Sequence, residues 1–155
     1  MLEHLVGKKS NKVLTTVERG AVKKFAEAIG ETHPIYTDRE YGLKSKYGDN
    51  IAPPTFPRTF DYGSIEGLDL PKAGLIHGEQ SFEYARPLVI GDTFYCSSLV
   101  ESYVEKTTKT GNLGFLTLLN IGETESGEVL FKSRIVIILT ETVRELMKHG
   151  NHSNA

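Results

Sequence analysis

The sequence predicts a single α+β domain in which a curved antiparallel sheet wraps around a helix. Three observations lead to this fold class. Residues 18–31 have the period of an amphipathic helix, the second half of the chain alternates apolar and polar residues over four runs, and turn signals separate those runs. Because each element has one apolar face, the sheet and the helix bury each other's apolar surface. The chain lacks GxGxxG, GxxxxGK[ST] and strand–helix alternation, so a nucleotide-binding α/β fold is not expected.

The chain has the size of one domain. With 155 residues, it can bury roughly two thirds of the surface that its unfolded form exposes, which suffices for one core. We assign residues 1–141 to a single domain and residues 142–155 to a short C-terminal helix and a frayed tail. The hydrophobic fraction of 39% and the charged fraction of 25% are ordinary for a soluble protein, and no apolar run approaches the ~20 residues of a membrane span.

Charge and cysteine content exclude several partners and cofactors. The formal net charge of −2 gives no long-range attraction to phosphate backbones, so we expect no nucleic-acid partner. The first residues lack the pattern of a secretory signal, and we expect a cytoplasmic protein. Cys96, the only cysteine, has no partner at metal-ligand spacing, and we expect it to be a small buried group in a strand rather than a reactive thiol. We predict no metal and no other cofactor.

The first elements follow from local patterns. Residues 12–17 (KVLTTV) are rich in β-branched side chains and suit a short strand. In ERGAVKKFAEAIGE, four apolar residues recur at helical spacing and form one face, with lysines and a glutamate on the other. Gly30 follows where helices commonly end on a glycine. The apolar residues of the predicted face are Val22, Phe25, Ala26 and Ile29.

The next stretch, residues 31–57, is irregular except for one short helix expected within TDREYGLKSKYG. A loop of this length in a small domain is usually functional. After it, residues 56–65 (FPRTFDYGSI) predict a largely buried helix. Pro57 is tolerated in the first turn of such a helix, and Thr55 is its expected cap.

The second half of the chain predicts four strands, at residues 80–84, 94–101, 114–124 and 129–139. The turn signals ARPLVIGD, KTGN and ESGE separate these strands, as antiparallel hairpins require. An open sheet leaves the backbone groups of its edge strands without partners. Pairing edge to edge with a second copy or a related chain satisfies these groups, so we expect a dimer.

Several segments together resemble a known family. They are FAEAIGETHPIYTD, IAPPTF, LIHGEQSFEYARPLVIGDTFYC and VEKTTKTGNLGFLTLLNIGETESGEVLFKSRIVIIL, and the resemblance covers about residues 12–139. The sequence is similar to the MaoC-like hot-dog dehydratases and R-specific enoyl-CoA hydratases. Within these it resembles the N-terminal dehydratase-like type, found as the non-catalytic subunit of mycobacterial 3-hydroxyacyl-ACP dehydratases. The resemblance implies a hot-dog fold, in which a curved sheet wraps around a central helix.

Active members of that family carry a loop of the form G-D-x-N-P-[LI]-H-x-D. Its Asp and His activate the water that adds to, or leaves from, the double bond of an acyl thioester, which requires an acid and a base near one water. In GETHPIYTD, Glu31 stands at the position of the Asp, His33 at that of the Asn and Tyr36 at that of the His. A phenol, with a reference pKa of about 10, exchanges protons poorly at neutral pH. Glu31, His33 and Tyr36 are thus the candidate catalytic residues, with His33 as an alternative base.

A second family segment is also changed. Active relatives have an I-A-H-G-M-like segment, in which a backbone N–H at the start of the central helix polarises the thioester carbonyl. This sequence has IAPPT at residues 51–55, and a proline has no N–H to donate. Two prolines, Pro53 and Pro54, therefore remove the donor, unless Thr55 or Phe56 supplies one in a shifted geometry.

The resemblance also implies which residues contact substrate. Phe56 and Phe60 hold positions that line the acyl channel in related proteins, with core packing as the alternative. By the same resemblance, His77 and Gly78 belong to the LIHGEQ segment rather than to the active-site loop, and a structural role of His77 at the sheet end or the dimer interface is favoured over substrate contact. The candidate substrate-binding residues are Pro54, Thr55, Phe56, Phe60, His77 and Gly78.

The resemblance implies a hot-dog subunit of a 3-hydroxyacyl thioester dehydratase or R-specific enoyl thioester hydratase. It would act on an acyl-CoA or an acyl carrier protein thioester, contributing acyl-chain binding and an interface to a catalytic hot-dog partner. Arg58, Lys44 and Lys46 are candidates for binding the anionic carrier. Two alternatives remain open: a self-sufficient homodimeric hydratase that uses Glu31 with His33 or Tyr36, and a non-catalytic acyl-CoA binding module.

Overall fold

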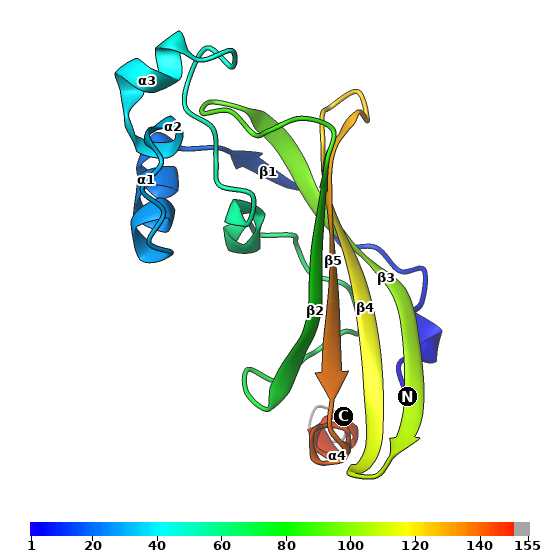
Figure 1. Ribbon diagram of the computed structural model, residues 1–155. Helices are drawn as coiled ribbons and strands as arrows, with labels where there is room; N and C mark the ends of the chain where they lie inside the picture. The colour runs from blue at the N-terminus through cyan, green and yellow to red at the C-terminus, as the bar shows by residue number, and fades with distance from the viewer. Residues whose placement is uncertain (151–155) are drawn as a thin grey trace.

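A computed structural model describes residues 1–150 and shows one five-stranded antiparallel sheet with the order β1-β3-β4-β5-β2 (Figure 1). Long strands β3, β4 and β5 form its centre, and β1 and β2 form its edges. In that part of the chain, every helix is too short or too polar to cross a lipid bilayer. The strands are β1 (Val13–Thr16), β2 (Leu75–Tyr84), β3 (Thr93–Thr108), β4 (Gly111–Glu123) and β5 (Val129–Leu139).

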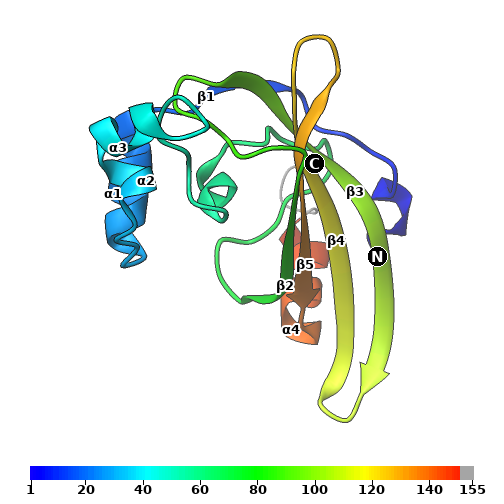
Figure 2. The same cartoon turned by 45° about the horizontal axis from the view of Figure 1, so that its top comes forward.

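The helices are short and fall into separate groups. Three of them, α1, α2 and α3, stand together beside one end of the sheet, and α4 lies near its other end (Figures 1 and 2). The tail expected after the C-terminal helix, at residues 151–155, lies outside the described residues. The α-helices are α1 (Arg19–Ala28), α2 (Pro34–Thr37), α3 (Arg39–Lys44) and α4 (Glu141–Gly150), and two 3-10 helices are η1 (Glu3–Leu5) and η2 (Phe56–Thr59).

The strand register confirms the alternation that the sequence predicts. Phe131, Ser133, Ile135 and Leu139 of β5 are all buried, whereas Lys132 between them is exposed. Across from this buried row, Gly122 of β4 pairs with Phe131. A side chain at Gly122 would collide with the Phe131 ring, so the glycine makes room for the aromatic core.

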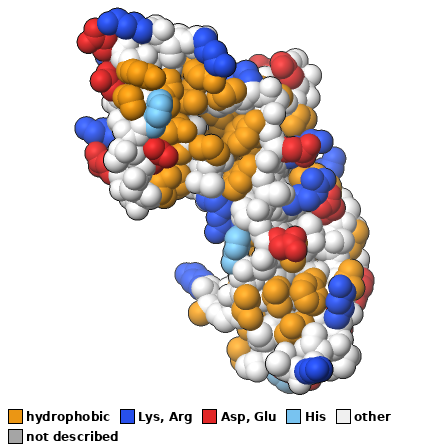
Figure 3. Space-filling model, viewed as in Figure 1, with side chains coloured by type: hydrophobic (Ala, Val, Ile, Leu, Met, Phe, Trp, Pro, Cys, Tyr) orange, Lys and Arg blue, Asp and Glu red, His pale blue; other side chains and the backbone are white. Residues whose placement is uncertain are grey.

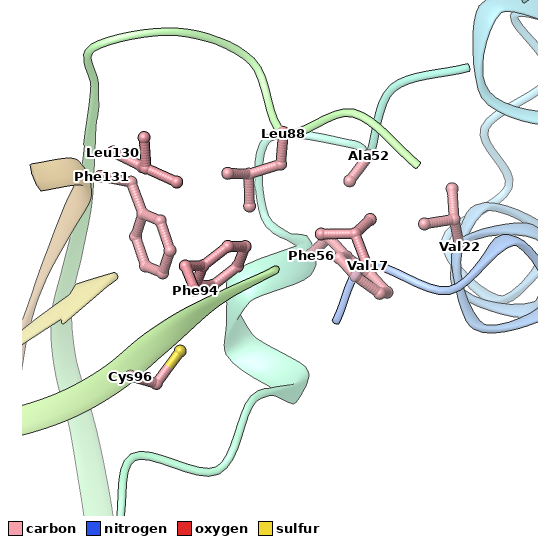
Figure 4. Packing of buried hydrophobic residues seen from close by; sticks show 9 residues of the cluster. All are labelled: Val17, Val22, Ala52, Phe56, Leu88, Phe94, Cys96, Leu130 and Phe131. Atoms are coloured by element: carbon pink, nitrogen blue, oxygen red, sulfur yellow. The ribbon is translucent and has the colours of Figure 1, made fainter. Parts of the chain in front are cut away.

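The buried core joins the sheet to the helices. Figure 4 shows Phe94 and Phe131 of the sheet near Phe56 of η2, with Val22 of α1 at the opposite side of the cluster. Burying such aromatic and aliphatic side chains supplies about 1.5–3 kcal/mol each relative to leaving them in water. This cluster therefore fixes the position of α1 and η2 relative to the sheet. Its members are Val17, Val22, Ala52, Phe56, Leu88, Phe94, Cys96, Leu130 and Phe131.

The helix predicted over residues 56–65 is wrong: η2 ends at Thr59, and an irregular chain follows. Gly63 has φ +76° and lies so close to the Asn11 carbonyl that no side chain fits, which is incompatible with a continuing helix. Thr55 precedes η2 but makes no capping bond with its side chain. The face predicted for α1 is also narrower than expected, because Ile29 is 50% exposed.

Asn50 holds the loop that carries α2 and α3. Its side chain is almost fully buried, and its Nδ2 donates hydrogen bonds to the carbonyl oxygens of Ile35 and Asp38, both at 2.8 Å. Its Oδ1 accepts a bond of 2.7 Å from Nη1 of Arg19 in α1. Gly42 of α3 packs directly on Asn50, where an added Cβ would come within 2.6 Å of the Asn50 side chain. Asn50 thus ties α1, α2 and α3 into one unit.

A charged group ties α4 to the sheet. The buried Arg144 of α4 contacts Glu105 of β3 at 2.8 Å, and Glu105 also accepts a hydrogen bond of 2.8 Å from the Tyr103 hydroxyl. The Arg144 guanidinium, followed by the Tyr103 hydroxyl, lowers the pKa of Glu105 to about 2. The carboxylate is therefore charged at neutral pH.

Replacing Asn50 with alanine should lower the free energy of unfolding by about 3 kcal/mol, because two carbonyl oxygens and a guanidinium lose their buried partner. Chemical denaturation of the wild type and the variant measures this difference. The matched control is Asn112→Ala, whose side-chain amide accepts one exposed bond from Thr107 and should cost less than about 1 kcal/mol. Equal losses in the two variants would contradict the role given to Asn50.

Glu105→Gln should lower the free energy of unfolding by about 1 kcal/mol at neutral pH, a value kept small because Glu105 is 38% exposed and screened by solvent. The pKa of Glu105 in the folded state lies below 4.5, the ordinary value of a glutamate, so the stabilisation is complete above pH 4.5 and is lost as the pH falls toward 2. Denaturation at several pH values should show the difference shrinking over that range. Glu125→Gln, in an exposed turn, should show no such pH dependence.

Candidate functional site

The candidate loop starts at the end of α1. Gly30 has φ +71°, its N–H donates to the Glu27 carbonyl, and the Glu31 N–H donates to the Ala26 carbonyl. This pair of bonds is the Schellman motif, which ends a helix on a glycine. The prediction that Gly30 ends the helix is confirmed, and the chain leaves α1 in a direction that main-chain groups alone determine.

Two of the candidate catalytic side chains, Glu31 and His33, accept hydrogen bonds from main-chain N–H groups of this loop. Glu31 Oε1 accepts a hydrogen bond of 3.0 Å from the His33 N–H, and His33 Nδ1 accepts one of 3.1 Å from the Ile35 N–H. His33 is thereby the N-cap of α2, a helical turn that the sequence did not predict. Because Nδ1 accepts this bond, the proton of the neutral ring is on Nε2. His33 can therefore donate a hydrogen bond from Nε2, but neither of its nitrogens is free to take a proton from water.

Tyr36 forms the wall of a cavity of about 250 Å³, which it shares with Pro54 and Tyr84. The Tyr84 hydroxyl donates a hydrogen bond of 2.5 Å to the Pro54 carbonyl, which fixes the far side of the cavity. Burial raises the pKa of Tyr36, and the nearby Glu31 carboxylate raises it further. Tyr36 is therefore a hydrogen-bond donor at neutral pH, and its proton is held more firmly than that of a free phenol.

The segment that polarises the thioester carbonyl in relatives has few free amides. The Ala52 N–H donates to the Leu88 carbonyl at 2.8 Å, and the Phe56 N–H donates to the Pro53 carbonyl at 2.9 Å. Between them stand the two prolines and Thr55. Within residues 1–150, the Thr55 N–H makes no hydrogen bond, so it is the free donor of this segment.

An open hollow of about 360 Å³ lies on the other side of Tyr36. We call it the tyrosine cup, because Tyr36, Tyr41 and Tyr47 line it together with His33 and Ser45. Figure 3 shows hydrophobic side chains gathered around a histidine on this part of the surface, with Lys and Arg side chains at the margin. Tyr36 and Ile51 line both the cup and the cavity, so the two hollows are neighbours.

The remaining predicted site residues lie elsewhere. Phe56 is 3% exposed, and Phe60 packs against the same core cluster, so neither lines the cavity or the cup. His77 and Gly78 belong to the edge strand β2, at a register shift. The His77 ring contacts Gln80 Oε1 at 3.1 Å, far along the strand from Tyr84. The structure thus brings Tyr36 and Pro54 together and separates them from His77 and Gly78.

The sequence does not predict the role of two important residues. Tyr84 is predicted only as part of the strand at residues 80–84, and Asn50 only as part of the irregular stretch at residues 31–57. Their places depend on contacts between distant parts of the chain, Tyr84 with Pro54 and Asn50 with Ile35. The available signals were weak: an aromatic residue at the last position of a strand, and an amide residue in a long loop next to a glycine.

The described residues contain neither a cluster of metal ligands nor an exposed cysteine. Residues 1–150 contain no group of three or more His, Cys, Asp or Glu side chains placed to hold a metal ion. Cys96 lies in the core, as the sequence predicts, and burial raises the pKa of its thiol to about 11. The thiol is therefore protonated and shielded from solvent.

Comparisons with known proteins agree with this fold. Residues 4–133 match the family model described as FAS1-like, dehydratase domain region. A UPF0336 protein of Thermobifida fusca is 33% identical over 132 residues, which cover 79% of this chain and 82% of that protein. UPF0336 relatives from Streptomyces species, 37–39% identical over 92 residues, are matched over about 61% of their own length.

Solved structures show the same fold at low sequence identity. A MaoC-like dehydratase superposes with a TM-score of 0.73 at 23% identity, over 92% of this chain and 44% of that one. The HadBC (3R-hydroxyacyl-ACP dehydratase) complex of Mycobacterium tuberculosis gives a TM-score of 0.67 at 18% identity, over 86% and 96%. The predicted hot-dog fold is confirmed. This chain belongs to the family described as FAS1-like, dehydratase domain region.

Proposed function

We propose that this chain is the non-catalytic hot-dog subunit of a 3-hydroxyacyl thioester dehydratase or R-specific enoyl thioester hydratase. It binds the thioester substrate and pairs with a hot-dog chain that carries an intact Asp/His loop. The family to which the chain belongs supports the reaction class. The changed loop supports the division of labour between the two chains.

One observation carries this proposal: the loop has no imidazole nitrogen or phenolate ready to take a proton from water. The pKa of Tyr36 is raised above its ordinary value, and His33 Nδ1 is occupied by the Ile35 N–H. Glu31 keeps a carboxylate, but one of its oxygens accepts the His33 N–H. Addition of water across an enoyl thioester needs both a base and an acid at one water, and this loop retains at most one of them.

The segment around Pro53 and Pro54 supports the same division of labour. A single free amide, that of Thr55, precedes a 3-10 helix of four residues rather than the first turn of a long helix. A preorganised donor aimed at the carbonyl oxygen contributes about 3–4 kcal/mol to related reactions. In the proposed complex, the partner supplies this donor together with its acid and base.

Pairing with a second chain has a natural place at the edge of the sheet. Strand β2 is the outer neighbour of β5, and its other edge has no strand beside it within residues 1–150. Ile76 on this strand is 49% exposed, and Gly78 sits at a register shift beside it. Unpaired edges of this kind are satisfied by a further strand. The HadBC and ChsH1-ChsH2 complexes, which have this fold, are precedents for the pairing that we propose.

The purified chain alone should not hydrate crotonyl-CoA or longer enoyl-CoAs above the rate of buffer, because it lacks a complete acid/base pair. Activity should appear on co-expression with a hot-dog chain that carries G-D-x-N-P-x-H, measured by the loss of enoyl absorbance. Turnover by the lone chain that disappears in Glu31→Gln would establish the self-sufficient enzyme instead. Inactivity both alone and with the partner, despite tight acyl-CoA binding, would favour the binding module.

Tyr36→Phe should change kcat of the complex by less than about threefold, because the phenol does not transfer the proton. If Tyr36 were the acid or base, its loss would lower kcat by about a hundredfold or more. Tyr84→Phe is the matched control, since it removes a hydroxyl from the opposite wall of the same cavity. Comparing kcat and KM of the two variants with those of the wild type decides whether Tyr36 only lines the cavity or takes part in proton transfer.

A further inference from the structure

The tyrosine cup has the features of a ligand site that the proposed reaction does not use. It is open to solvent, with Tyr41 46% exposed, and it holds about 360 Å³. Three partly exposed tyrosine rings at one hollow offer apolar faces and hydroxyl groups together, as ligand sites do. The cup also borders the Tyr36 cavity, because Tyr36 and Ile51 belong to both.

The tyrosine hydroxyl groups of the cup have no protein partner. Within residues 1–150, no hydrogen bond uses the hydroxyl of Tyr36, Tyr41 or Tyr47. Two tyrosines packed against the core differ: Tyr62 donates to the Pro57 carbonyl at 2.7 Å, and Tyr84 donates to the Pro54 carbonyl. The three hydroxyl groups of the cup can therefore donate to a ligand in place of water.

His33 adds a donor in a fixed direction. Its Nδ1 is held by the Ile35 N–H, so Nε2 carries the proton. The ring meets Tyr41 edge to face at a centroid distance of 5.7 Å and Tyr36 at 6.1 Å. The cup therefore presents flat apolar faces together with N–H and O–H donors, which suits a planar heterocycle whose ring nitrogens accept hydrogen bonds.

Positive charge lies at the margin of the cup. Lys46 Nζ stands 5.3 Å from the centroid of the Tyr47 ring. Lys46 forms no ion pair with another residue of the described chain, whereas Lys44 is paired with Glu40. A cation without an ion-pair partner beside an aromatic hollow suits a phosphorylated base.

We propose that the tyrosine cup binds the adenine nucleotide of coenzyme A, with the base between the tyrosine rings and the phosphates toward Lys46. The pantetheine arm then passes the shared wall of Tyr36 and Ile51 into the neighbouring cavity and on toward the partner's site. This assignment rests on the proposed function and names its carrier as coenzyme A. A carrier protein offers the same arm without the base, and it would leave the cup empty.

Titration calorimetry on the full chain tests this assignment with three probes. These are coenzyme A, adenosine 3′,5′-bisphosphate, which has the base without the arm, and 4′-phosphopantetheine, which has the arm without the base. Coenzyme A and the bisphosphate should bind and compete with each other. Tyr47→Ala should weaken both by about tenfold, the loss expected when one stacking ring is removed, and should leave 4′-phosphopantetheine unchanged.

Further variants separate stacking and charge from folding. Tyr47→Phe keeps the ring and should retain most of the affinity for the bisphosphate. Lys46→Gln should weaken the bisphosphate by several-fold and reduce the salt dependence of its binding. Tyr95→Ala is the matched control, because Tyr95 is a half-buried tyrosine of β3 outside the cup; it should bind all three probes like the wild type.

Two binding results would overturn the assignment: no binding of the bisphosphate to the wild-type chain, or equal weakening of the bisphosphate and 4′-phosphopantetheine by Tyr47→Ala. These outcomes are independent of the reaction. A complex that hydrates enoyl-CoA without inhibition by the bisphosphate would refute the cup and leave the proposed function standing. A chain that binds the bisphosphate but forms no active complex would refute the function and leave the cup standing.

Discussion

The buried side chain of Asn50 is the constraint on which the rest of the site depends. Its amide satisfies two carbonyl oxygens of the α2–α3 loop and receives the Arg19 guanidinium of α1, in a place from which water is excluded. Buried polar groups without partners are costly, so the loop has one arrangement in which all of these groups are satisfied. That arrangement places Tyr36 between two hollows and sets the orientation of His33 above α2.

With the backbone of the loop fixed, the chemistry of its side chains becomes easier to interpret. Glu31 and His33 give their acceptor atoms to main-chain amides, and Tyr36 forms a wall. These groups stabilise the loop and shape its surface. In the complex that we propose, proton transfer falls to the partner chain, which pairs at the open edge of β2.

Local periodicity was enough to predict most of the fold. The strand expected at residues 129–139 has the bounds of β5, and the helix expected before Gly30 is α1, because each depends on burial of one face. The helix expected at residues 56–65 failed because Gly63 needs a positive φ beside Asn11, a contact between distant residues. The roles of Tyr84 and Asn50 could not be predicted for the same reason, because both depend on contacts with residues far away in the sequence.

The loop is tied down at both ends through main-chain atoms, by the Schellman bonds after α1 and by the Asn50 amide on two carbonyl groups. Between these ties, Glu31 and His33 each accept one hydrogen bond from a main-chain N–H, whereas the Tyr36 side chain makes none within residues 1–150. Position 36 can therefore be exchanged without rebuilding the scaffold, whereas an exchange at position 31 or 33 removes one hydrogen bond of the loop.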